Sequence, residues 1–312
     1  MKEQQKLIHL ALAFDKGYIT PFYVLLTSIF HNNKANKLAI HTIATGIDQQ
    51  EKERLISYVN QNKGDIYFYE INEDLTSNLI IPANSHFTVA TYYRLFFPTL
   101  VPKEITKLIY IDVDTVVIGD LAELYNTIID SVPIAAVEEP GNLIRPDLGL
   151  NESNKYFNAG VLLINVILWK DQDITKKAIT FLSKYPERIK FADQDALNAV
   201  LIDNWFELNK KYNLTYSDVL PGNLPTKYKF SSFLKDIVII HYSTNHKPWL
   251  GLGANRFRYI YHTYLRMSPH VNQKKYIDFK LKSDYLFRFI KIRLIEFCFD
   301  HPIIVKIWRE LK

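Results

Sequence analysis

Two carboxylates at the end of an apolar segment, Asp112 and Asp114, are the side chains of this sequence best suited to chemistry. They lie within the stretch from Leu108 to Val117, which otherwise has the apolar character of a β-strand. Because strand side chains alternate between two faces, both carboxylates are expected to point to one side and Val113 to the other. Such a pair repels unless a positive charge lies between its members, and a hard divalent cation that carries phosphate oxygens suits that place. An Asp-x-Asp pair alone is a weak signal, so the remaining sequence must support it.

A second polar group follows an apolar segment near the end of the sequence. Residues 237–240 are predicted to form a buried strand, and His241, Lys247 and Trp249 follow it closely. A lone histidine after a strand is often structural. Here an imidazole and a lysine emerge together, and this pair of groups can complete a metal site and neutralise a diphosphate.

Polar residues also lie at the ends of three other predicted elements. Asp15 follows the first strand, Asn158 precedes an apolar strand, and Asp193-Gln194-Asp195 precedes a helix. Helix capping favours acidic residues at such a position and accounts for one aspartate. It does not account for the three polar residues together.

The predicted elements alternate between strands and helices, which favours a mainly parallel sheet with helices on both faces. Strands are expected at residues 7–14, 38–44, 66–71, 134–137, 161–165 and 237–240, and another, within the stretch 108–117, ends at the Asp112/Asp114 pair. Helices are expected at residues 21–32, 49–62, 88–100, 121–129, 169–185 and 196–202. Ligands of such sheets bind beyond the carboxyl ends of the strands, where Asp15 and the Asp112/Asp114 pair lie. Arg94, in the third of these helices, is either a surface charge or a ligand-binding residue.

Glycine-rich phosphate loops are missing from the sequence, which disfavours a dinucleotide-binding fold and a P-loop enzyme. Any phosphate must therefore be held by metal and side chains. The single cysteine, Cys298, excludes an internal disulfide and a thiolate cluster for zinc, which is consistent with a reducing compartment. The apolar run from Leu7 to Leu10 is too short for a signal peptide, and no run of about 18 apolar residues predicts a membrane-spanning helix.

The net charge of +5 is concentrated at the end of the chain. Residues 274–312 contain ten Lys or Arg and five Asp or Glu, whereas residues 1–273 contain 28 of each. The neutral body argues against a nucleic-acid partner. The basic, aromatic and helical tail is typical of a segment that lies in an anionic membrane interface, and helices packed on the core are the alternative. We expect a catalytic domain at residues 1–260 and a tail at 261–312, and a chain shortened to residue 273 is expected to remain a soluble enzyme.

These motifs, in this order, resemble those of glycosyltransferase family 8, the retaining transferases that include bacterial lipopolysaccharide glucosyl- and galactosyltransferases and, more distantly, glycogenin. The resemblance covers about residues 7 to 250. The motifs are Ala13-Phe14-Asp15-x-x-Tyr18, Thr91-Tyr92-Tyr93-Arg94, Tyr110-Ile111-Asp112-Val113-Asp114, Tyr156-Phe157-Asn158-Ala159-Gly160-Val161, Asp193-Gln194-Asp195 and His241 to Trp249. The resemblance implies an α/β GT-A fold with a Rossmann-like, mainly parallel sheet flanked by helices. It also implies a UDP-hexose donor bound with Mn²⁺, with Mg²⁺ as the alternative metal.

Carried over by position, the resemblance implies which residues bind the donor and the metal. The uridine would contact Ala13, Asp15 and Tyr18. The diphosphate and donor sugar would lie near Arg94, Val113, Thr244 and Lys247. The metal ligands would be Asp112, Asp114 and His241. One position departs from the family, because Thr244 stands where glycine is usual, and it is expected to reshape the loop or to offer its hydroxyl.

The resemblance also implies the catalytic residues Asn158, Asp193 and Gln194 around the sugar and the attacking hydroxyl. Breaking the anomeric bond leaves negative charge on UDP, which the metal and Lys247 would stabilise. The family retains the anomeric configuration, and a same-face attack steered by the leaving phosphate is usually favoured. Either Asp193 or Gln194 would then stabilise positive charge or orient reacting groups.

Two other functions remain as alternatives to a transferase. One is a non-catalytic relative that binds sugar nucleotides or glycans. The other is a haloacid-dehalogenase-like phosphatase with Asp112 as nucleophile and Asp114 as acid/base, although its downstream acidic motif is missing. Within the transferase hypothesis, the hexose is glucose or galactose, and the acceptor is lipopolysaccharide, a related surface glycolipid or a protein. The expected location is the cytoplasm or the inner face of the cytoplasmic membrane.

Overall fold

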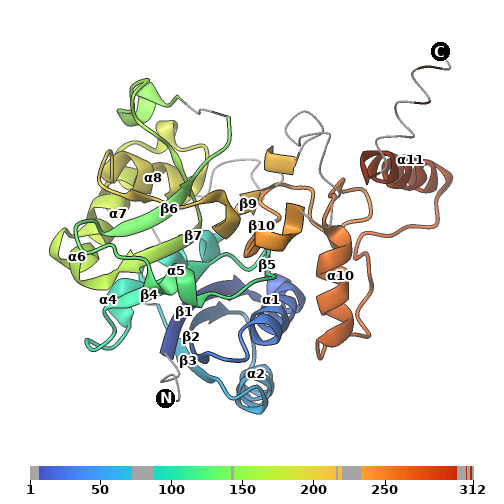
Figure 1. Ribbon diagram of the computed structural model, residues 1–312, viewed down its shortest axis with the longest axis horizontal. Coiled ribbons are helices and arrows are strands. Elements are labelled where there is room, and N and C mark those ends of the chain that lie inside the picture. The colour runs from blue at the N-terminus through green and yellow to red at the C-terminus, as the bar shows by residue number, and fades with distance from the viewer. Residues whose placement is uncertain are drawn as a thin grey trace.

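The computed structural model describes residues 7–71, 88–141, 144–215, 217–219, 233–300, 307 and 310, and a seven-stranded sheet lies at its centre (Figure 1). The strand order is β3-β2-β1-β4-β7-β6-β8. The strands are β1 (Leu7–Asp15), β2 (Lys37–Thr45), β3 (Asp65–Tyr69), β4 (Lys107–Ile111), β6 (Ile134–Glu138), β7 (Phe157–Asn165) and β8 (Phe206–Glu207). Only β7 runs antiparallel to its neighbours, so the predicted mainly parallel α/β sheet is confirmed.

The side chains of β1 show why helices cover both faces of the sheet. Its even-numbered residues from Ile8 to Phe14 pack into one core with α1 (Ile19–Asn32) and α2 (Gln49–Gln61). Ala11 and Ala13 point into the opposite core, and these small side chains let the 3₁₀ turn η2 (Val89–Leu95) pack close to β1. The second core also contains α6 (Val166–Asp171), α7 (Ile174–Lys184) and α8 (Ala192–Val200). Burial of each large apolar side chain stabilises such a core by about 1.5–3 kcal/mol.

A second, three-stranded sheet brings distant segments of the chain together. It consists of β5 (Thr115–Val117), β10 (Ile239–His241) and β9 (Leu214–Thr215) in that order. His241, the last residue of β10, lies opposite Thr115 on one side and Thr215 on the other. Strand pairing therefore carries His241 to the segment that follows β4.

The expectation that Asp112 and Asp114 belong to the end of a strand and share a face by its alternation is wrong. The segment around them forms β4 and β5, which belong to different sheets, and Asp112 to Asp114 form the turn between them. The two carboxylates therefore do not share a face through strand alternation. They are brought together by a turn, which Thr115 Oγ1 closes with a hydrogen bond of 2.8 Å to the carbonyl oxygen of Asp112.

Two of the expected helices are interrupted. Residues 88–100 form η2 and then the short helix α4 (Phe97–Leu100), because Pro98 has no amide hydrogen to donate to the carbonyl of Arg94. Residues 169–185 are divided between α6 and α7, and Asp173 between them adopts a left-handed backbone with φ of 53°. The helix expected at residues 121–129 is shorter, as α5 (Ala122–Asn126), and α8 begins before the predicted residue 196.

Two helices follow the strands at the end of the described chain. α10 (Arg258–Met267) packs against α1 and buries Tyr261 and Leu265, so the expected boundary between residues 260 and 261 falls inside this helix. α11 (Ser283–Asp300) lies farther out, at the edge of the molecule (Figure 1). Among the residues that the structure describes, no helix has the length and apolar character needed to cross a bilayer.

Candidate active site

A cavity of about 570 Å³ lies beyond the carboxyl ends of β1 and β4. It has the size of an ordinary ligand site, since such pockets span about 300–1,000 Å³. All of the site residues expected from the sequence line this cavity: Ala13, Asp15, Tyr18, Arg94, Asp112, Val113, Asp114, Asn158, Asp193, Gln194, His241, Thr244 and Lys247. The structure thus brings them together, while their individual roles stay predictions.

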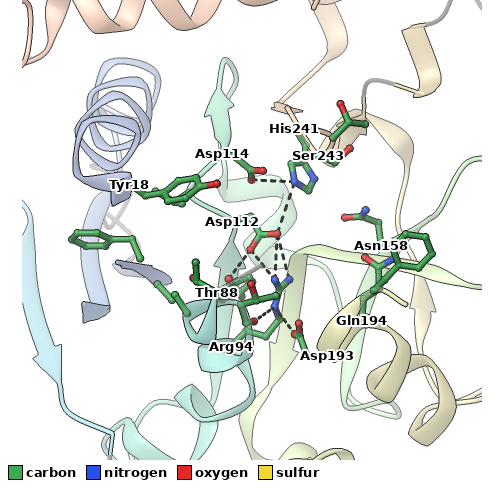
Figure 2. Close-up of a pocket in the computed structure, with 18 of the residues that line it drawn as sticks. Tyr18, Thr88, Arg94, Asp112, Asp114, Asn158, Asp193, Gln194, His241 and Ser243 are labelled. Atoms are coloured by element: carbon green, nitrogen blue, oxygen red, sulfur yellow. Dashed lines mark hydrogen bonds and ion pairs between the residues drawn. The ribbon is translucent and has the colours of Figure 1, made fainter. Parts of the chain in front are cut away.

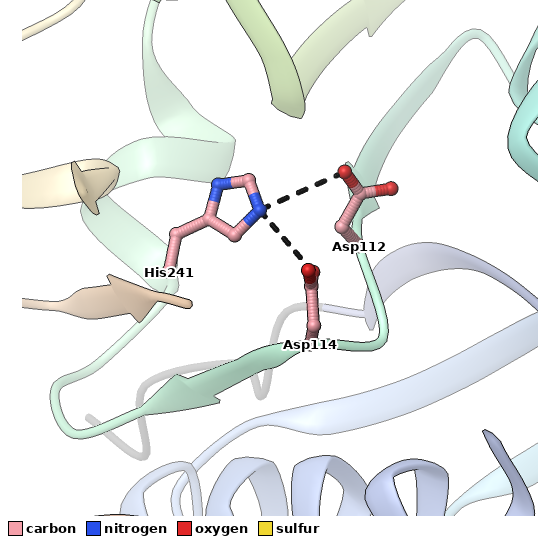
Figure 3. A group of neighbouring side chains, drawn as sticks. All are labelled: Asp112, Asp114 and His241. Atoms are coloured by element: carbon pink, nitrogen blue, oxygen red, sulfur yellow. Dashed lines mark ion pairs between the residues drawn. The ribbon is translucent and has the colours of Figure 1, made fainter. Parts of the chain in front are cut away.

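Asp112, Asp114 and His241 form a compact group of potential metal ligands (Figure 3). His241 Nε2 lies 3.2 Å from Asp114 Oδ1 and 3.8 Å from Asp112 Oδ2. One ligand atom from each residue lies within 4.8 Å of the other two. Two hard carboxylates and an imidazole form a donor set that suits Mn²⁺ or Mg²⁺. The residues present therefore fit the divalent cation expected from the sequence.

A chain of side-chain amides orients the His241 ring. Asn213 Nδ2 donates to Asn158 Oδ1 over 2.8 Å, which leaves Asn213 Oδ1 as an acceptor 3.0 Å from His241 Nδ1. His241 Nδ1 therefore carries the hydrogen, and Nε2 turns its lone pair toward the carboxylates. Asn158 is in turn held by Glu139, whose Oε2 accepts from Asn158 Nδ2 over 2.6 Å.

Gly160 allows this arrangement because any larger residue would occupy the same space. A Cβ atom on Gly160 would lie 2.2 Å from His241 Cε1 and 2.9 Å from Asp112 Oδ2. The Gly160 carbonyl also accepts a 2.8 Å hydrogen bond from the backbone of Asp112. The glycine of β7 is thus required by close packing against two of the potential metal ligands.

Lys247 contacts Asp114 at Oδ2, whereas His241 lies nearest to Oδ1. Lys247 Nζ donates to Asp114 Oδ2 and, over 2.7 Å, to the carbonyl oxygen of Tyr242. Burial alone would raise the pKa of the Asp114 carboxyl, but the charge and the hydrogen bond of Lys247 outweigh burial and hold that pKa well below its ordinary range. Asp114 is therefore an anion at any physiological pH.

The Arg94 guanidinium lies between two carboxylates at the base of the cavity (Figure 2). Its Nη2 is 3.0 Å from Asp112 Oδ1, and its Nε is 2.6 Å from Asp193 Oδ2. Nη1 donates to the carbonyl oxygen of Ala159. The guanidinium also stacks over the Tyr110 ring at 4.7 Å, and the Tyr110 hydroxyl donates to Asp112 Oδ1. Arg94 is thus a fixed buried cation and not a surface charge.

Asp193 is a buried carboxylate that accepts no hydrogen bond from the described residues. It is 1% exposed, and the N–H of Arg94 Nε points instead to the carbonyl oxygen of Thr91, 3.2 Å away. Burial raises the pKa of Asp193 to about 7 against the opposing charge of Arg94. The preceding residue, Ala192, has a φ of 49°, a left-handed conformation that is strained for alanine and is common near functional sites.

Both the oxygen and the nitrogen of the Gln194 side-chain amide form hydrogen bonds. Its Oε1 accepts from the backbone of Ala159 over 3.0 Å, and its Nε2 donates to the Tyr156 hydroxyl over 3.2 Å. These bonds fix the amide at the wall of the cavity. Gln194 therefore presents a fixed amide group that a sugar hydroxyl can contact.

Asp195 has a structural role that distinguishes it from its two neighbours. Its Oδ2 accepts hydrogen bonds from the backbone of Lys190 and Phe191 at 2.6 and 2.8 Å, which ties down the start of α8. Its Oδ1 accepts from the Tyr156 hydroxyl and pairs with Arg145. The N-cap of α8 is Phe191, which makes no side-chain capping bond, so the N-capping role expected for one aspartate of the motif is wrong. Asp195 lies within the first turn of the helix and holds the segment before it.

The part of the cavity next to β1 is built by polar and aromatic residues. Asp15 accepts from the backbone of Gly17 and from the Thr88 hydroxyl, each over 2.8 Å. The Tyr18 ring meets Trp249 edge to face at 5.8 Å. This region offers a flat aromatic surface beside a fixed carboxylate, which suits a nucleobase and its ribose.

Thr244 uses its hydroxyl for the local turn. Its Oγ1 accepts from the backbone of His246 over 3.2 Å, and its φ is not positive. The residue lines the cavity without the left-handed backbone that would require glycine. The hydroxyl expected from the sequence is thus directed to the segment that carries Lys247.

Asn213, Glu139 and Tyr110 contribute to the site, although none of them was assigned a role there from the sequence. Tyr110 was visible within the strand that ends at the aspartates, and Glu139 at the start of a long polar segment after another strand. Asn213 carried no signal, because it precedes a two-residue strand and its importance arises from pairing between β9 and β10.

Comparison with solved structures gives the fold class. The structure of the galactosyltransferase LgtC in complex with donor and acceptor sugar analogs matches with a TM-score of 0.74 over 90% of this chain and 100% of that one, at 19% identity. The glycosyltransferase GlyE of Streptococcus pneumoniae matches with a TM-score of 0.63 over 82% of this chain and 60% of that one, at 25% identity. The chain has the GT-A fold, as expected from the sequence.

Comparison of sequences gives the family. The model of glycosyl transferase family 8 matches residues 9–253, and the chain belongs to this family of enzymes. General stress protein A of Bacillus subtilis is 29% identical over 86% of this chain and 99% of that relative. The lipopolysaccharide 1,3-galactosyltransferase of Salmonella typhimurium is 30% identical over 79% of this chain and 74% of that relative. Family membership leaves the phosphatase alternative without support.

Proposed function

We propose that this protein is a metal-dependent retaining hexosyltransferase that transfers glucose or galactose from a UDP-sugar to a lipopolysaccharide or related surface glycolipid. The observation that carries the proposal is the Asp112, Asp114 and His241 cluster, flanked by two buried cations in a ligand-sized cavity. A cluster of this kind matches a diphosphate that arrives with a divalent cation.

The positive groups of the cavity match the charge that develops on the departing UDP. Mn²⁺ or Mg²⁺ held by Asp112, Asp114 and His241 would supply a Lewis acid beside the diphosphate. Lys247 and Arg94 are both 5% exposed and are fixed by hydrogen bonds before any ligand arrives. Fixed cations in a low-dielectric site need no reorganisation as the bond to the anomeric carbon breaks, so they lower the barrier.

We assign different roles to the two candidate catalytic side chains. Asp193 is paired with Arg94 and nearly inaccessible, so it is poorly placed to attack the anomeric carbon. It keeps Arg94 in position, and its negative charge stabilises the positive charge that develops on the sugar. Gln194 and Asn158 present fixed amides that orient hydroxyls of the sugar or the acceptor. This division supports a same-face attack and not a covalent intermediate.

The names of the relatives support a lipopolysaccharide acceptor. Besides the Salmonella galactosyltransferase, the lipopolysaccharide 1,2-glucosyltransferase of Escherichia coli K12 is 28% identical over 89% of this chain. Both glucose and galactose donors are thus represented among the relatives, and the donor of this chain has to be measured.

The exposed face of α11 supports contact with an anionic membrane. Phe287, Ile290 and Leu294, which we call the outer stripe, are 71, 55 and 59% exposed and recur at helical spacing. The exposed Arg288 and Lys291 lie on the same helix. Apolar residues flanked by basic ones suit the interface of an anionic leaflet, where each basic residue contributes about 1 kcal/mol. We place the protein in the cytoplasm or on the inner face of the cytoplasmic membrane.

The transferase proposal is tested by UDP release from a panel of UDP-sugars, with Mn²⁺ and then with EDTA. Metal-dependent turnover of one UDP-hexose, lost in Asp114→Asn, would support the proposal and identify the donor. Binding of UDP without turnover, even with lipopolysaccharide acceptors, would point to a non-catalytic relative. Absence of both binding and turnover would refute the proposed function.

The membrane proposal is tested by co-sedimentation with vesicles that contain phosphatidylglycerol. Replacing the outer stripe by Phe287→Ser, Ile290→Ser and Leu294→Ser should abolish binding, and added salt should weaken it. The matched control is Ile128→Ser, at a 75% exposed position on the body of the protein. Equal binding of the control and the triple variant would contradict a membrane role for α11.

A further inference from the structure

The segment that carries Lys247 contains only turns. We call residues 242–257, between β10 and α10, the Lys247 loop. Lys247 is 5% exposed and donates to Asp114, so its position in the cavity depends on where the backbone of this loop lies. Short turns such as the 3.1 Å bond from Leu250 N to Lys247 O do not by themselves attach the loop to the rest of the protein.

One attachment comes from α10. Arg258 Nη1 donates to the carbonyl oxygens of Pro248 and Leu250 at 2.8 and 2.7 Å, and Nη2 donates to that of Gly253. Arg258 is 5% exposed. The buried guanidinium therefore holds several carbonyls of the loop at once.

Further attachments come from the segment that the sequence suggested to be a separate tail. Arg293 Nη2 on α11 donates to the carbonyl oxygens of Gly251 and Gly253 at 3.2 and 2.8 Å. Glu296 Oε1 accepts from the backbone of Asn255 over 2.6 Å. Before α11, Asp278 Oδ1 accepts from the backbone of Gly251 over 2.7 Å. The inner face of α11 thus binds the loop through backbone groups.

Close packing accompanies these hydrogen bonds. A Cβ atom on Gly251 would lie 2.2 Å from the Tyr285 hydroxyl and 3.3 Å from the Phe289 ring, both on α11. A Cβ atom on Gly253 would lie 3.0 Å from the carbonyl oxygen of Lys247. The two glycines let α11 approach one side of the loop while the other side supports Lys247.

The contacts continue from α11 to the cavity without a gap. Glu296 holds Asn255, and Asn255 Nδ2 donates to the carbonyl oxygen of His246, 3.2 Å away. His246 precedes Lys247, and Trp249 beyond it packs against Tyr18 at the cavity wall. A shift of α11 would therefore move the backbone on both sides of Lys247.

We propose that Arg293 and Glu296 are positioning residues for Lys247, so that α11 is part of the donor site and not a removable tail. The inference rests on the proposed function, in which Lys247 binds the diphosphate of UDP. It predicts that a chain shortened to residue 273 loses donor affinity. It also implies that a membrane bound to the outer stripe acts on a helix whose inner face supports the donor site.

The test compares the binding of UDP and UMP to the full chain by calorimetry in Mn²⁺. UMP lacks the second phosphate, so damage to the position of Lys247 should affect UDP selectively. Arg293→Met and Glu296→Leu should weaken UDP binding roughly tenfold, as residues that orient a ligand group typically do, with little effect on UMP. Glu296→Gln keeps an acceptor for Asn255 and should restore binding. Arg288→Met, on the exposed side of the same helix, is the control.

A double-mutant cycle makes the test specific for Lys247. In the Lys247→Met background, Arg293→Met should cause no further loss of UDP affinity, because its effect passes through Lys247. Additive losses, or equal losses for UDP and UMP, would overturn the proposal. If the wild type binds UDP and Arg293→Met binds it as tightly, the positioning role alone is refuted. A wild type that binds no UDP refutes the proposed function itself.

Discussion

His241 Nδ1 lies 3.0 Å from Asn213 Oδ1, on the side of the imidazole that faces away from Asp112 and Asp114. The contact joins the last residue of β10 to the residue that precedes the neighbouring strand β9. Asn213 is fully buried and is itself oriented by Asn158. The histidine is thus held in one tautomer with its other nitrogen directed at the carboxylates.

Removal of this contact should weaken the metal site without removing a ligand. We expect Asn213→Ala to lower Mn²⁺ affinity about 10–100-fold, the range typical of residues that orient a metal-binding histidine. Calorimetric titration with Mn²⁺ measures the change. Asn209→Ala is the control, since the Asn209 side chain accepts from the backbone of Lys211 in a neighbouring turn. Unchanged Mn²⁺ affinity in Asn213→Ala would show that the amide does not position the histidine.

Gly160→Ala should disrupt the same site by crowding. The added methyl would meet His241 Cε1 at 2.2 Å, and overpacking of this kind usually costs about 1–3 kcal/mol. We expect lower stability in urea and loss of Mn²⁺ binding. In the double variant Gly160→Ala/His241→Ala part of the stability should return, because only the 2.9 Å contact with Asp112 Oδ2 then remains, while Mn²⁺ binding stays absent. Persistent instability of the double variant would place the clash elsewhere.

Arg94→Met should destabilise the protein strongly. It leaves the buried Asp193 carboxylate and its neighbour Asp112 without their cation, and loss of one partner of a buried ion pair costs about 3–5 kcal/mol. Urea unfolding in EDTA measures the loss. Adding Asp193→Asn to this variant should recover part of the stability, because one uncompensated charge is then removed. Additive effects of the two changes would indicate that Arg94 and Asp193 do not interact.

Asp193 should make stability depend on pH in the metal-free protein. The pKa of Asp193 is about 7, above its ordinary value of 3.8, so the folded protein binds this proton more tightly than the unfolded chain does. The resulting stabilisation is complete below pH 4 and is lost as the pH rises toward 7. The loss has an upper limit on the order of 4 kcal/mol, at about 1.4 kcal/mol for each pH unit.

Urea unfolding of the wild type and Asp193→Asn at pH 5 and pH 8, both in EDTA, tests this expectation. Relative to the wild type, the variant should be more stable at pH 8 than at pH 5. Asp195→Asn is the control, and it should be destabilised at both values because that carboxylate accepts several hydrogen bonds. A difference between wild type and Asp193→Asn that does not vary with pH would contradict the raised pKa.

The sequence predicted the parts of this protein that depend on local pattern. Alternating strands and helices predicted the mainly parallel sheet, and polar residues after apolar segments predicted which side chains would gather at its carboxyl edge. That prediction succeeded for Asp15 and for the Asp112/Asp114 pair because the end of a strand is marked by its neighbours in sequence. The resemblance of ordered motifs added the family, which the comparisons confirm.

Only the tertiary structure decided how these side chains are oriented. The proximity of Asp112 and Asp114 results from a turn between two sheets, and the tautomer of His241 depends on Asn213, which carries no signal of its own. From the sequence, the tail was expected to be separate from the catalytic domain. Its apolar residues lie on both faces of α11, so that taken together they do not recur at a regular helical spacing. One face is exposed while the other binds the Lys247 loop. Such contacts join segments far apart in the chain through backbone groups, which every residue possesses, so residue types alone do not reveal them.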